Sequence, residues 1–324
     1  MNIGTMGAYL EDLTTRLWDY QREYYPNVEE YFERTQSDLR RPPIFMKDKA
    51  GDNVLHRRGA PPEEVAHLEA LLPTRERHRW FRSMKSSQAL VQSVFGNLIL
   101  SGEIGELNDV LDDDGQKAFG GAVMSPSSVK LEHSVKHLGE PRGTSIDVFV
   151  EGHHRVAVEC KLSESDIGRC SRPAIRPTQR RYSTDHCDGG YRRQRGRENR
   201  CSLSEIGVKY WDLVPRVLSW DNERDWDVCP LLDSYQLVRN ILAVCVKEDG
   251  TVASDEAHVL LVYDQRNPAF QRGGKALAAF TKTHDALLDP GVLRRCSWQR
   301  LIGHLRLKSV LPWLTEALAA KYGL

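Results

Sequence analysis

Apolar residues recur at steps of three and four in several stretches of the chain, which is the spacing of one face of an α-helix. The clearest stretch runs from Met84 to Leu100, and it predicts an amphipathic helix. Leu231 to Val246 favours a buried helix, and Val310 to Tyr322 an amphipathic helix that closes the chain. Residues 7 to 36 carry the same spacing with Pro26 interrupting it, so we expect two short helices there.

Four short runs rich in β-branched residues show the partial alternation expected of strands, with turn residues between them. The order along the chain is a helix, three strands, a long irregular insert, a helix, a strand and a helix. This order predicts an α/β (α+β) fold with a mixed sheet flanked by helices. The expected strands are Val129 to Val135, Ser145 to Val150, Val156 to Cys160 and His258 to Tyr263.

We expect one catalytic core with additions, because a chain of 324 residues can bury a sizeable core. Residues 1–83 should form an N-terminal arm of helices and extended, proline-rich chain. The core should span 84–264 and include an arginine- and cysteine-rich insertion at 163–230. Residues 265–324 should be a helical extension that packs on the core.

The 45 basic and 45 acidic side chains cancel, so any binding to nucleic acid must come from local clusters of charge. The chain is already charged at Glu11, before any apolar stretch of the secretory kind. No apolar run approaches the about 18 residues that a membrane span needs. Seven cysteines, an odd count, argue against a disulfide framework. These features predict a cytoplasmic protein with no membrane partner.

The segment SIDVFVEGHHRVAVECKL carries the strongest sign of chemistry. Asp147 begins one expected strand, and the next strand delivers Glu159 and Lys161 two residues apart on one face. With a turn near Gly152, Asp147 and Glu159 can share one divalent cation, which polarises a phosphate and generates hydroxide in phosphodiester hydrolysis. Lys161 would stabilise charge on the phosphate or orient the attacking water. The alternative is a structural ion cluster in which Lys161 only pairs with Glu159.

The element order and this motif together resemble the PD-(D/E)xK nuclease superfamily, over roughly Met84 to Tyr263. Asp147 and the triplet Glu159-Cys160-Lys161 match its active residues, whereas isoleucine stands where the motif's name has proline. The resemblance implies a restriction-endonuclease-like core and a nuclease that needs Mg²⁺ or Mn²⁺.

The superfamily also tends to supply a further acidic or amide ligand from the first helix or first strand. Glu132 is preferred here, because a carboxylate within an apolar strand is costly to bury without a partner. Gln88 comes second, Gln236 could approach from the second helix, and Glu103 and Glu106 are the other candidates. The resemblance implies a catalytic set of Asp147, Glu159, Lys161, Glu132 and Gln88. The implied Mg²⁺ ligands are Asp147, Glu159 and Glu132.

Between Arg169 and Arg200 the chain carries ten arginines against three acids, a local charge of +7. Arginine forks bind phosphates bidentately, and Tyr182 and Tyr191 could serve as stacking platforms, so this run predicts contact with a DNA backbone. The alternative is a solvated, disordered charged loop. The expected nucleic-acid-binding residues are Arg169, Arg172, Arg176, Arg180, Arg181, Arg192 and Arg193.

The same insertion holds thiol and imidazole groups that could meet at one tetrahedral Zn²⁺ and fold a loop of low apolar content. No CxxC pair is present, so buried structural cysteines are an equal alternative. Cys229 lies further along the chain, whereas Cys160, Cys245 and Cys296 sit in apolar runs and are expected in the core. The candidate zinc ligands are Cys170, Cys187, Cys201 and His186.

The sequence therefore predicts a metal-dependent endonuclease that hydrolyses DNA, with a role in restriction, defence or repair. A catalytically inactive DNA-binding protein of the same fold is the alternative, and the intact Asp147, Glu159 and Lys161 argue against it. A phosphohydrolase acting on nucleotides is a third hypothesis, and no GxxxxGK phosphate loop is present. DNA is the expected partner, and the cutting of both strands of a duplex favours a homodimer.

Overall fold

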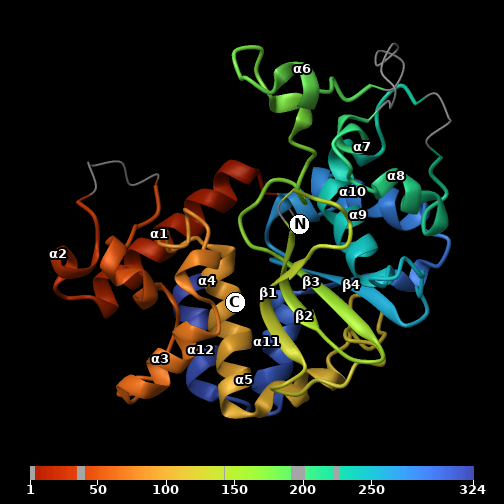
Figure 1. The fold of residues 1–324 in the computed structure, drawn as a ribbon. Helices are drawn as coiled ribbons and strands as arrows, with labels where there is room; N and C mark the ends of the chain where they lie inside the picture. The colour runs from red at the N-terminus through yellow and green to blue at the C-terminus, as the bar shows by residue number, and fades with distance from the viewer. Residues whose placement is uncertain (1–3, 35–40, 142, 191–200, 222–225) are drawn as a thin grey trace.

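The structure is a computed structural model that describes residues 4–34, 41–141, 143–190, 201–221 and 226–324 (Figure 1). Within this part of the chain, five strands form one mixed sheet in the order β1-β2-β3-β4-β5. The strands are β1 (Val129–Val135), β2 (Thr144–Val150), β3 (Arg155–Lys161), β4 (Ala257–Tyr263) and β5 (Leu293–Ser297). The predicted α+β fold with a mixed sheet is confirmed.

The sheet is antiparallel at one side and parallel at the other. β1, β2 and β3 form an antiparallel meander, because short connections reverse the chain between them. β4 and β5 pair in parallel with β3 and β4 respectively. Parallel neighbours need a crossover, which α9 (Leu231–Cys245) provides before β4 and α10 (Lys275–Asp285) before β5. β4 is buried along its whole length, as expected of a strand covered on both faces.

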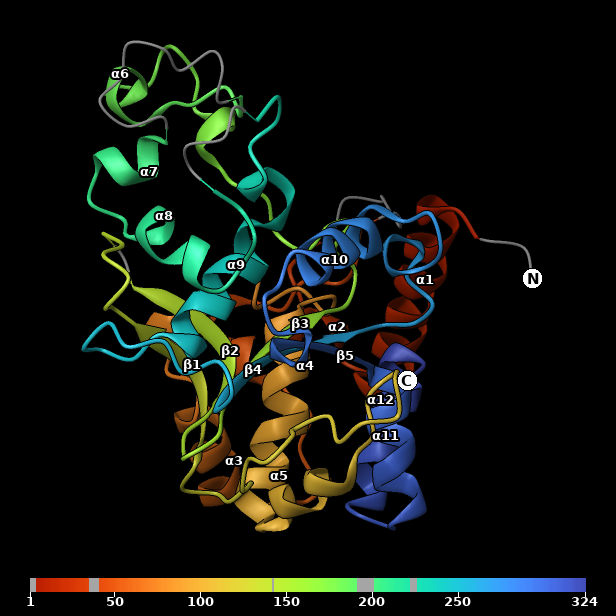
Figure 2. The same cartoon turned by 90° about the vertical axis from the view of Figure 1, so that its right-hand side faces the viewer.

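Helices cover both faces of the sheet (Figure 2). On β3, Val158 and Cys160 pack into one buried cluster, and Ala157 packs into the other. Because side chains alternate along a strand, Glu159 and Lys161 project with Ala157 toward the layer that contains α9. That layer consists of α8 (Tyr210–Leu213), α9 and α10. The opposite layer consists of α1 (Met6–Tyr24), α4 (Ser87–Val91), α5 (Asn97–Ser101), α11 (Trp298–Leu307) and α12 (Pro312–Tyr322).

The N-terminal arm and the insertion carry short helices. α2 (Val28–Tyr31) and α3 (Pro62–Ala70) belong to the arm, whereas α6 (Tyr182–Asp185) and α7 (Ser202–Glu205) belong to the insertion. In Figures 1 and 2 the insertion projects beyond α8 and α9. The described 3₁₀ turns are Lys47–Asn53, Thr74–Glu76, Glu103–Asp109, Arg172–Ala174, Val214–Arg216, Pro268–Phe270 and Pro290–Val292.

The predicted helix over Met84 to Leu100 is present but changes its pitch. α4 leads into a π-helical turn, Gln92–Gly96, and then into α5, which ends at Gly102 with a φ of 78°. π-turns within helices are rare and often lie near functional sites. The fully buried Gln92 donates from Nε2 to the Leu68 carbonyl at 2.7 Å, so the turn also attaches the helix to α3.

The four predicted strands and α9 are confirmed within one residue of their expected ends. The pattern does not predict β5, which lies in the segment expected to be a helical extension, so residues 265–324 are not purely helical. Two consecutive arginines interrupt the alternation of apolar and polar residues that would have predicted this strand. Arg294 donates to the Lys117 carbonyl and Arg295 pairs with Asp113 at 3.3 Å, so both are held at the sheet edge by partners distant in sequence.

A buried lysine joins the C-terminal helix α12 to the N-terminal arm. Lys321 of α12 is 1% exposed and donates to the backbone carbonyl and the side-chain Oδ1 of Asn53, at 2.5 and 2.9 Å. Asn53 donates in turn to the carbonyls of Phe81 and Ser83, at 2.6 and 2.8 Å. Burial lowers the pKa of Lys321 to about 7. The arm is thereby fixed to the C-terminal helix through one continuous buried network.

The lowered pKa of Lys321 predicts a specific dependence of stability on pH. Between about 7 and the ~10.4 of an unfolded lysine, the unfolded chain binds one proton more than the folded chain. The free energy of unfolding should therefore rise as pH increases through 7, by up to ~1.4 kcal/mol per pH unit. Urea unfolding at pH 6, 7 and 8 measures this rise, which Lys321→Met should lack. An equal rise in both proteins would show that another group causes it.

Candidate active site

Five of the residues that the sequence singles out line one pocket. The pocket has a volume of about 400 Å³ and lies where β1, β2 and β3 meet the start of α4 and the side of α9. Residues from four separate parts of the chain therefore share one small space. The five are the predicted catalytic set, Gln88, Glu132, Asp147, Glu159 and Lys161, and the further candidate Gln236 lines the pocket as a sixth.

Glu159 and Lys161 of β3 form a buried ion pair. Only 1% and 7% of these residues is exposed, and Lys161 Nζ lies 2.8 Å from Glu159 Oε1. α9 supplies two amides to the pair: Gln236 donates to Glu159 Oε1 and Asn240 to Glu159 Oε2, each at 2.7 Å. Gln236 also accepts from Lys161 Nζ at 3.0 Å. The carboxylate is hydrogen-bonded at both oxygens, which a buried charge requires.

Asn240 is a site residue that the sequence analysis misses, whereas Gln236 is among its candidates. The spacing of Gln236 and Asn240 in the sequence could have identified Asn240. Two amides four residues apart lie on one face of a helix. On the largely buried α9, such a pair indicates a buried polar partner across the packing surface.

Asp147 of β2 reaches the pocket from the neighbouring strand. Its Oδ2 accepts the backbone N–H of Cys160 at 2.7 Å, so the hairpin itself holds this carboxylate beside Glu159. Burial raises the pKa of Asp147 well above its usual range, the carboxylates of Glu159 and Glu132 raise it further, and Lys161 opposes them. The pocket therefore concentrates more negative charge than Lys161 neutralises.

Glu132 of β1 and Gln88 of α4 meet at the edge of the pocket. Gln88 donates from Nε2 to Glu132 Oε1 at 2.6 Å, and the Ser145 hydroxyl donates to the other oxygen. Burial raises the pKa of Glu132; these two hydrogen bonds oppose the rise and Glu159 adds to it. Glu132 also has a φ of 48°, in the left-handed region that residues with a side chain rarely adopt. Backbone strain of this kind clusters at functional sites.

Gln88 also holds the N-terminal arm against the pocket. Its Oε1 accepts the backbone N–H of His78 at 2.9 Å, and its Nε2 donates to the Glu76 carbonyl at 3.1 Å. Both ends of the amide are thus occupied. In this arrangement Gln88 orients Glu132 and the arm segment, which is a different role from the metal ligand that the resemblance implies.

Glu132, Asp147 and Glu159 offer the donor chemistry of a hard divalent cation. Mg²⁺ and Mn²⁺ prefer carboxylate oxygens, and the excess of negative charge in the pocket favours a cation. Among the described residues, no three His, Cys, Asp or Glu side chains stand close enough to hold a metal in their present positions. The amides of Gln236 and Asn240 each donate to one oxygen of Glu159, and Oε2, which accepts from Asn240, has a second lone pair that could face a cation.

Three of the insertion's arginines already have acidic partners. Arg169 pairs with Asp233 at 2.7 Å and Arg172 with Asp185 at 2.8 Å, and Arg181 lies 3.9 Å from Asp185. These pairs reduce the positive charge that the insertion can offer to a phosphate backbone. The other predicted contacts are either exposed, which holds for Arg176 and Arg180, or outside the described residues, which holds for Arg192 and Arg193.

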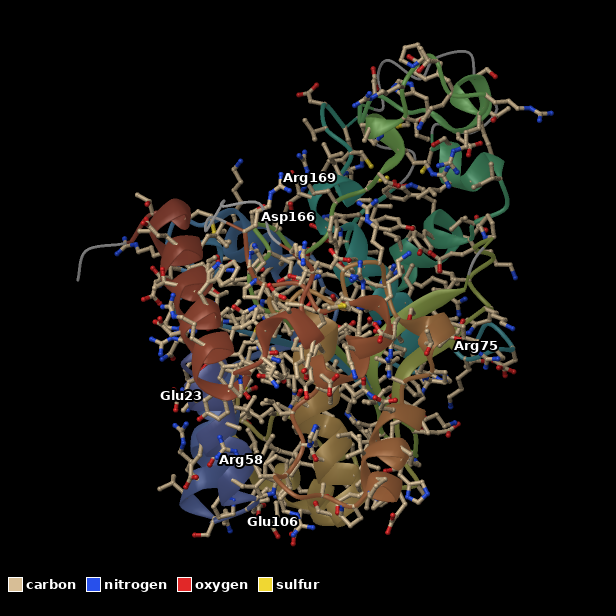
Figure 3. All side chains as sticks on the ribbon, turned by 90° about the vertical axis from the view of Figure 1, so that its left-hand side faces the viewer. Glu23, Arg58, Arg75, Glu106, Asp166 and Arg169 are labelled. Atoms are coloured by element: carbon tan, nitrogen blue, oxygen red, sulfur yellow. The ribbon has the colours of Figure 1, made fainter. Side chains whose placement is uncertain are left out.

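The arginines that line the pocket come from other segments. Arg75 belongs to the arm, and Arg239 of α9 donates to the Ser145 carbonyl at 3.2 Å. Figure 3 shows Arg75 on the side of the sheet and Arg169 at the base of the insertion, well separated in that view. The basic run RERHRWFRSMK at 75–85 is the sequence signal for this surface, and it is weaker than the signal of the insertion because it is shorter.

The predicted zinc ligands are partly brought together. The Cys170 thiol lies within electrostatic reach of the thiols of Cys201 and Cys187, and Cys229 lies within reach of all three. His186 stacks on the Tyr182 ring with the centroids 4.3 Å apart. The cluster therefore gains a cysteine that the predicted set does not contain.

A family model described as Restriction Endonuclease associating with ARP matches residues 29–323. The match takes in most of the arm, the pocket, the insertion and β5. Neither the curated proteins nor the solved structures gave a significant match to this chain. Within the described residues, no helix combines the length and the apolar character that crossing a membrane would take.

The raised pKa of Asp147 predicts that its charge destabilises the metal-free protein. The folded state binds this proton more tightly than the unfolded chain, so stability is lost as pH rises through the raised pKa. Asp147→Asn should therefore raise Tm at pH 7.5 by about 2–4 °C, the scale of ~1 kcal/mol in a protein of this size.

Thermal unfolding in EDTA checks this expectation, and the advantage of the variant should vanish as pH falls below the ~3.9 of an unfolded aspartate, where both states carry a neutral Asp147. Added Mg²⁺ should then raise the Tm of the wild type more than that of Asp147→Asn. A variant that is less stable than the wild type in EDTA would contradict the charge argument.

Proposed function

Because this chain belongs to the family of restriction endonucleases associating with ARP, we propose that it hydrolyses the phosphodiester bonds of DNA as a divalent-metal-dependent endonuclease. The observation that supports this most is the convergence of Asp147, Glu159 and Lys161 in one pocket. Metal-assisted hydrolysis of a phosphodiester needs carboxylates for the cation and a positive group for the phosphate. All three are held there by hydrogen bonds to the backbone or to α9.

Asp147, Glu159 and Glu132 are the residues that would hold Mg²⁺ or Mn²⁺, since they combine carboxylate chemistry with a surplus of negative charge. When bound, such a cation supplies Lewis-acid polarisation of the phosphate and a water that ionises near neutral pH. Glu132 is oriented for this by Gln88 and Ser145, which donate to its two oxygens.

Lys161 stabilises the charge that builds on the phosphate during attack. Burial lowers the pKa of Lys161, but the carboxylates of Glu159, Glu164 and Asp147 outweigh burial and raise it, so the ammonium stays charged. Its Nζ donates to Glu159 and Gln236 in the absence of substrate. One of these hydrogen bonds can pass to a phosphate oxygen, and the other keeps the ammonium aimed at the scissile group.

The substrate class is DNA, and the role is one in restriction, defence or repair. Cutting both strands of a duplex takes two such pockets, so we propose that two copies of the chain act on one DNA site. The second candidate, a catalytically inactive DNA-binding protein of the same fold, is supported by the arginine content of the insertion. An inactive DNA-binding protein would not need the carboxylates around Lys161, whose burial costs desolvation free energy.

Two single substitutions should separate cleavage from binding. Asp147→Ala removes a proposed metal ligand, and Lys161→Ala removes the positive charge that would face the phosphate. Each should therefore lower Mg²⁺-dependent DNA cleavage by about 10²-fold or more. Conversion of supercoiled plasmid to nicked and linear forms gives the cleavage rate, and a gel-shift titration in EDTA gives DNA affinity.

The control is Glu151→Gln, because Glu151 lies on the same hairpin but pairs with Lys130 outside the pocket. This variant should cut DNA like the wild type, and all variants should keep DNA affinity within a few-fold. A wild-type protein that binds DNA without cutting it in either Mg²⁺ or Mn²⁺ would support the inactive DNA-binding protein instead.

A further inference from the structure

A second pocket adjoins the catalytic one. It has a volume of about 560 Å³ and shares His78, Ser87 and Glu164 with the pocket that contains Asp147 and Glu159. Because the two spaces share these residues, they are direct neighbours, separated by the side chains of Ser87 and Glu164, which are hydrogen-bonded at 2.8 Å. We call this second space the arm groove; Arg41, Trp80 and Lys85 also line it.

The arm segment 75–85 supplies four of the residues that line the groove, His78, Trp80, Ser83 and Lys85, so that Trp80 is its aromatic side chain and Lys85 its cation. Its sequence, RERHRWFRSMK, holds five arginine or lysine residues against one glutamate. Trp80 is 55% exposed, and the Arg79 guanidinium lies 5.1 Å from its ring centroid. A flat aromatic face beside cations is the combination with which proteins hold single-stranded nucleic acid, through base stacking and phosphate contact.

The exposure of Trp80 is built into the fold, because its neighbours are fixed on both sides. Gln88 bonds to the backbone of Glu76 and His78, and Asn53 donates to the backbone carbonyls of Phe81 and Ser83. Phe81 is buried at 1% exposure. The ring of Trp80 is therefore held at the surface, where a base could stack on it.

We propose that the arm groove binds the DNA strand next to the scissile phosphate in unstacked form, with one base on Trp80, one phosphate on Lys85 in the groove and another on Arg75 in the catalytic pocket. This inference rests on the proposed function, because it names the substrate conformation at the same active site. A single strand fits better than an intact duplex, since a paired base cannot present its face to a tryptophan.

Tryptophan fluorescence tests the stacking without any cleavage. Trp80 is the exposed tryptophan among those that the structure describes, so a short single-stranded oligonucleotide titrated in EDTA should quench its emission. Trp80→Phe should lose most of the quenching while keeping affinity within a few-fold. Trp80→Ala should weaken binding by about 5- to 100-fold, the range measured for loss of one base stack. Trp313→Phe is the control and should quench like the wild type.

Unchanged affinity in Trp80→Ala would overturn the proposal, and so would quenching by an intact duplex that single strands do not produce. The same titration with Asp147→Ala separates this inference from the proposed function. Asp147→Ala should be quenched like the wild type; a wild type that is quenched but cuts no DNA in Mg²⁺ or Mn²⁺ would support the groove and refute the nuclease. Cleavage that is insensitive to Trp80→Ala, with no quenching, would do the reverse.

A second inference comes from the insertion and does not depend on the nuclease. Four of its thiols share one turn geometry, in which the backbone N–H two residues further along interacts with the sulfur. Such N–H groups stabilise a thiolate and orient it, as the outer hydrogen bonds of metal sites do. The pairs are Cys170 with Arg172, Cys187 with Gly189, Cys201 with Leu203 and Cys229 with Leu231.

Backbone hydrogen bonds hold these segments side by side. The Cys229 N–H donates to the Gly189 carbonyl at 2.7 Å, and the Cys170 N–H donates to the Leu232 carbonyl at 2.8 Å. The geometry points to a Zn²⁺ site formed by the thiolates of Cys170, Cys187, Cys201 and Cys229. Since no three described side chains are close enough to hold a metal as they stand, the sulfurs must rotate inward, releasing their protons to solvent as the ion binds.

Metal analysis of the purified full-length chain tests the site, with an expected content of one zinc per chain. Cys229→Ser should bring zinc close to zero. His186→Ala should leave it unchanged, because the site uses Cys229 in place of the imidazole. Cys245→Ser, a buried cysteine of α9 outside the cluster, is the matched control and should also retain the ion.

Cobalt substitution keeps the test decisive where a variant folds poorly. Co²⁺ added to the chelated wild type should give the visible spectrum of a tetrahedral thiolate complex, and Zn²⁺ should then displace it. A wild-type chain that carries no zinc and gives no such spectrum overturns the site. Loss of zinc in His186→Ala with retention in Cys229→Ser overturns the proposed ligand set.

Discussion

The structure depends on the burial of one negative charge, the Glu159 carboxylate, beneath α9. A carboxylate removed from water needs compensation at both oxygens, and here Lys161, Gln236 and Asn240 provide it. These contacts fix the position of α9 on the sheet. Since α9 is also the crossover between β3 and β4, the same contacts determine where the parallel half of the sheet joins the antiparallel half. Architecture and chemistry share one set of hydrogen bonds.

The N-terminal arm is part of the active centre. Gln88 bonds at once to Glu132 in the pocket and to the backbone of the arm, so the position of the arm and the orientation of that carboxylate are coupled. The family match begins at residue 29 and so takes in most of the arm together with the catalytic strands. A division of the chain into a core and a dispensable N-terminal segment would cut through this coupling.

Local pattern in the sequence predicts the strands, α9 and the grouping of Asp147, Glu159 and Lys161, because alternation on two strands joined by a turn determines which side chains share a face. The contribution of Asn240 depends on how α9 docks, which one helix does not specify. β5 is hidden because the alternation of LRRCS is broken by arginines, whose partners lie far away in sequence. Likewise, arginine content alone does not show that Arg172 is paired with Asp185.

The contact of α1 with α12, strengthened by Lys321 on Asn53, has a consequence for the order of folding. These partners lie at opposite ends of the described chain, so a chain growing from the ribosome cannot form the contact until the last helix has emerged. β5, which completes the sheet, also appears late in synthesis. A partly made chain can form the β-meander that carries Asp147 and Glu159, but it cannot lock the arm over it. Synthesis itself thus delays the assembly of the complete centre until α12 has been made and has emerged.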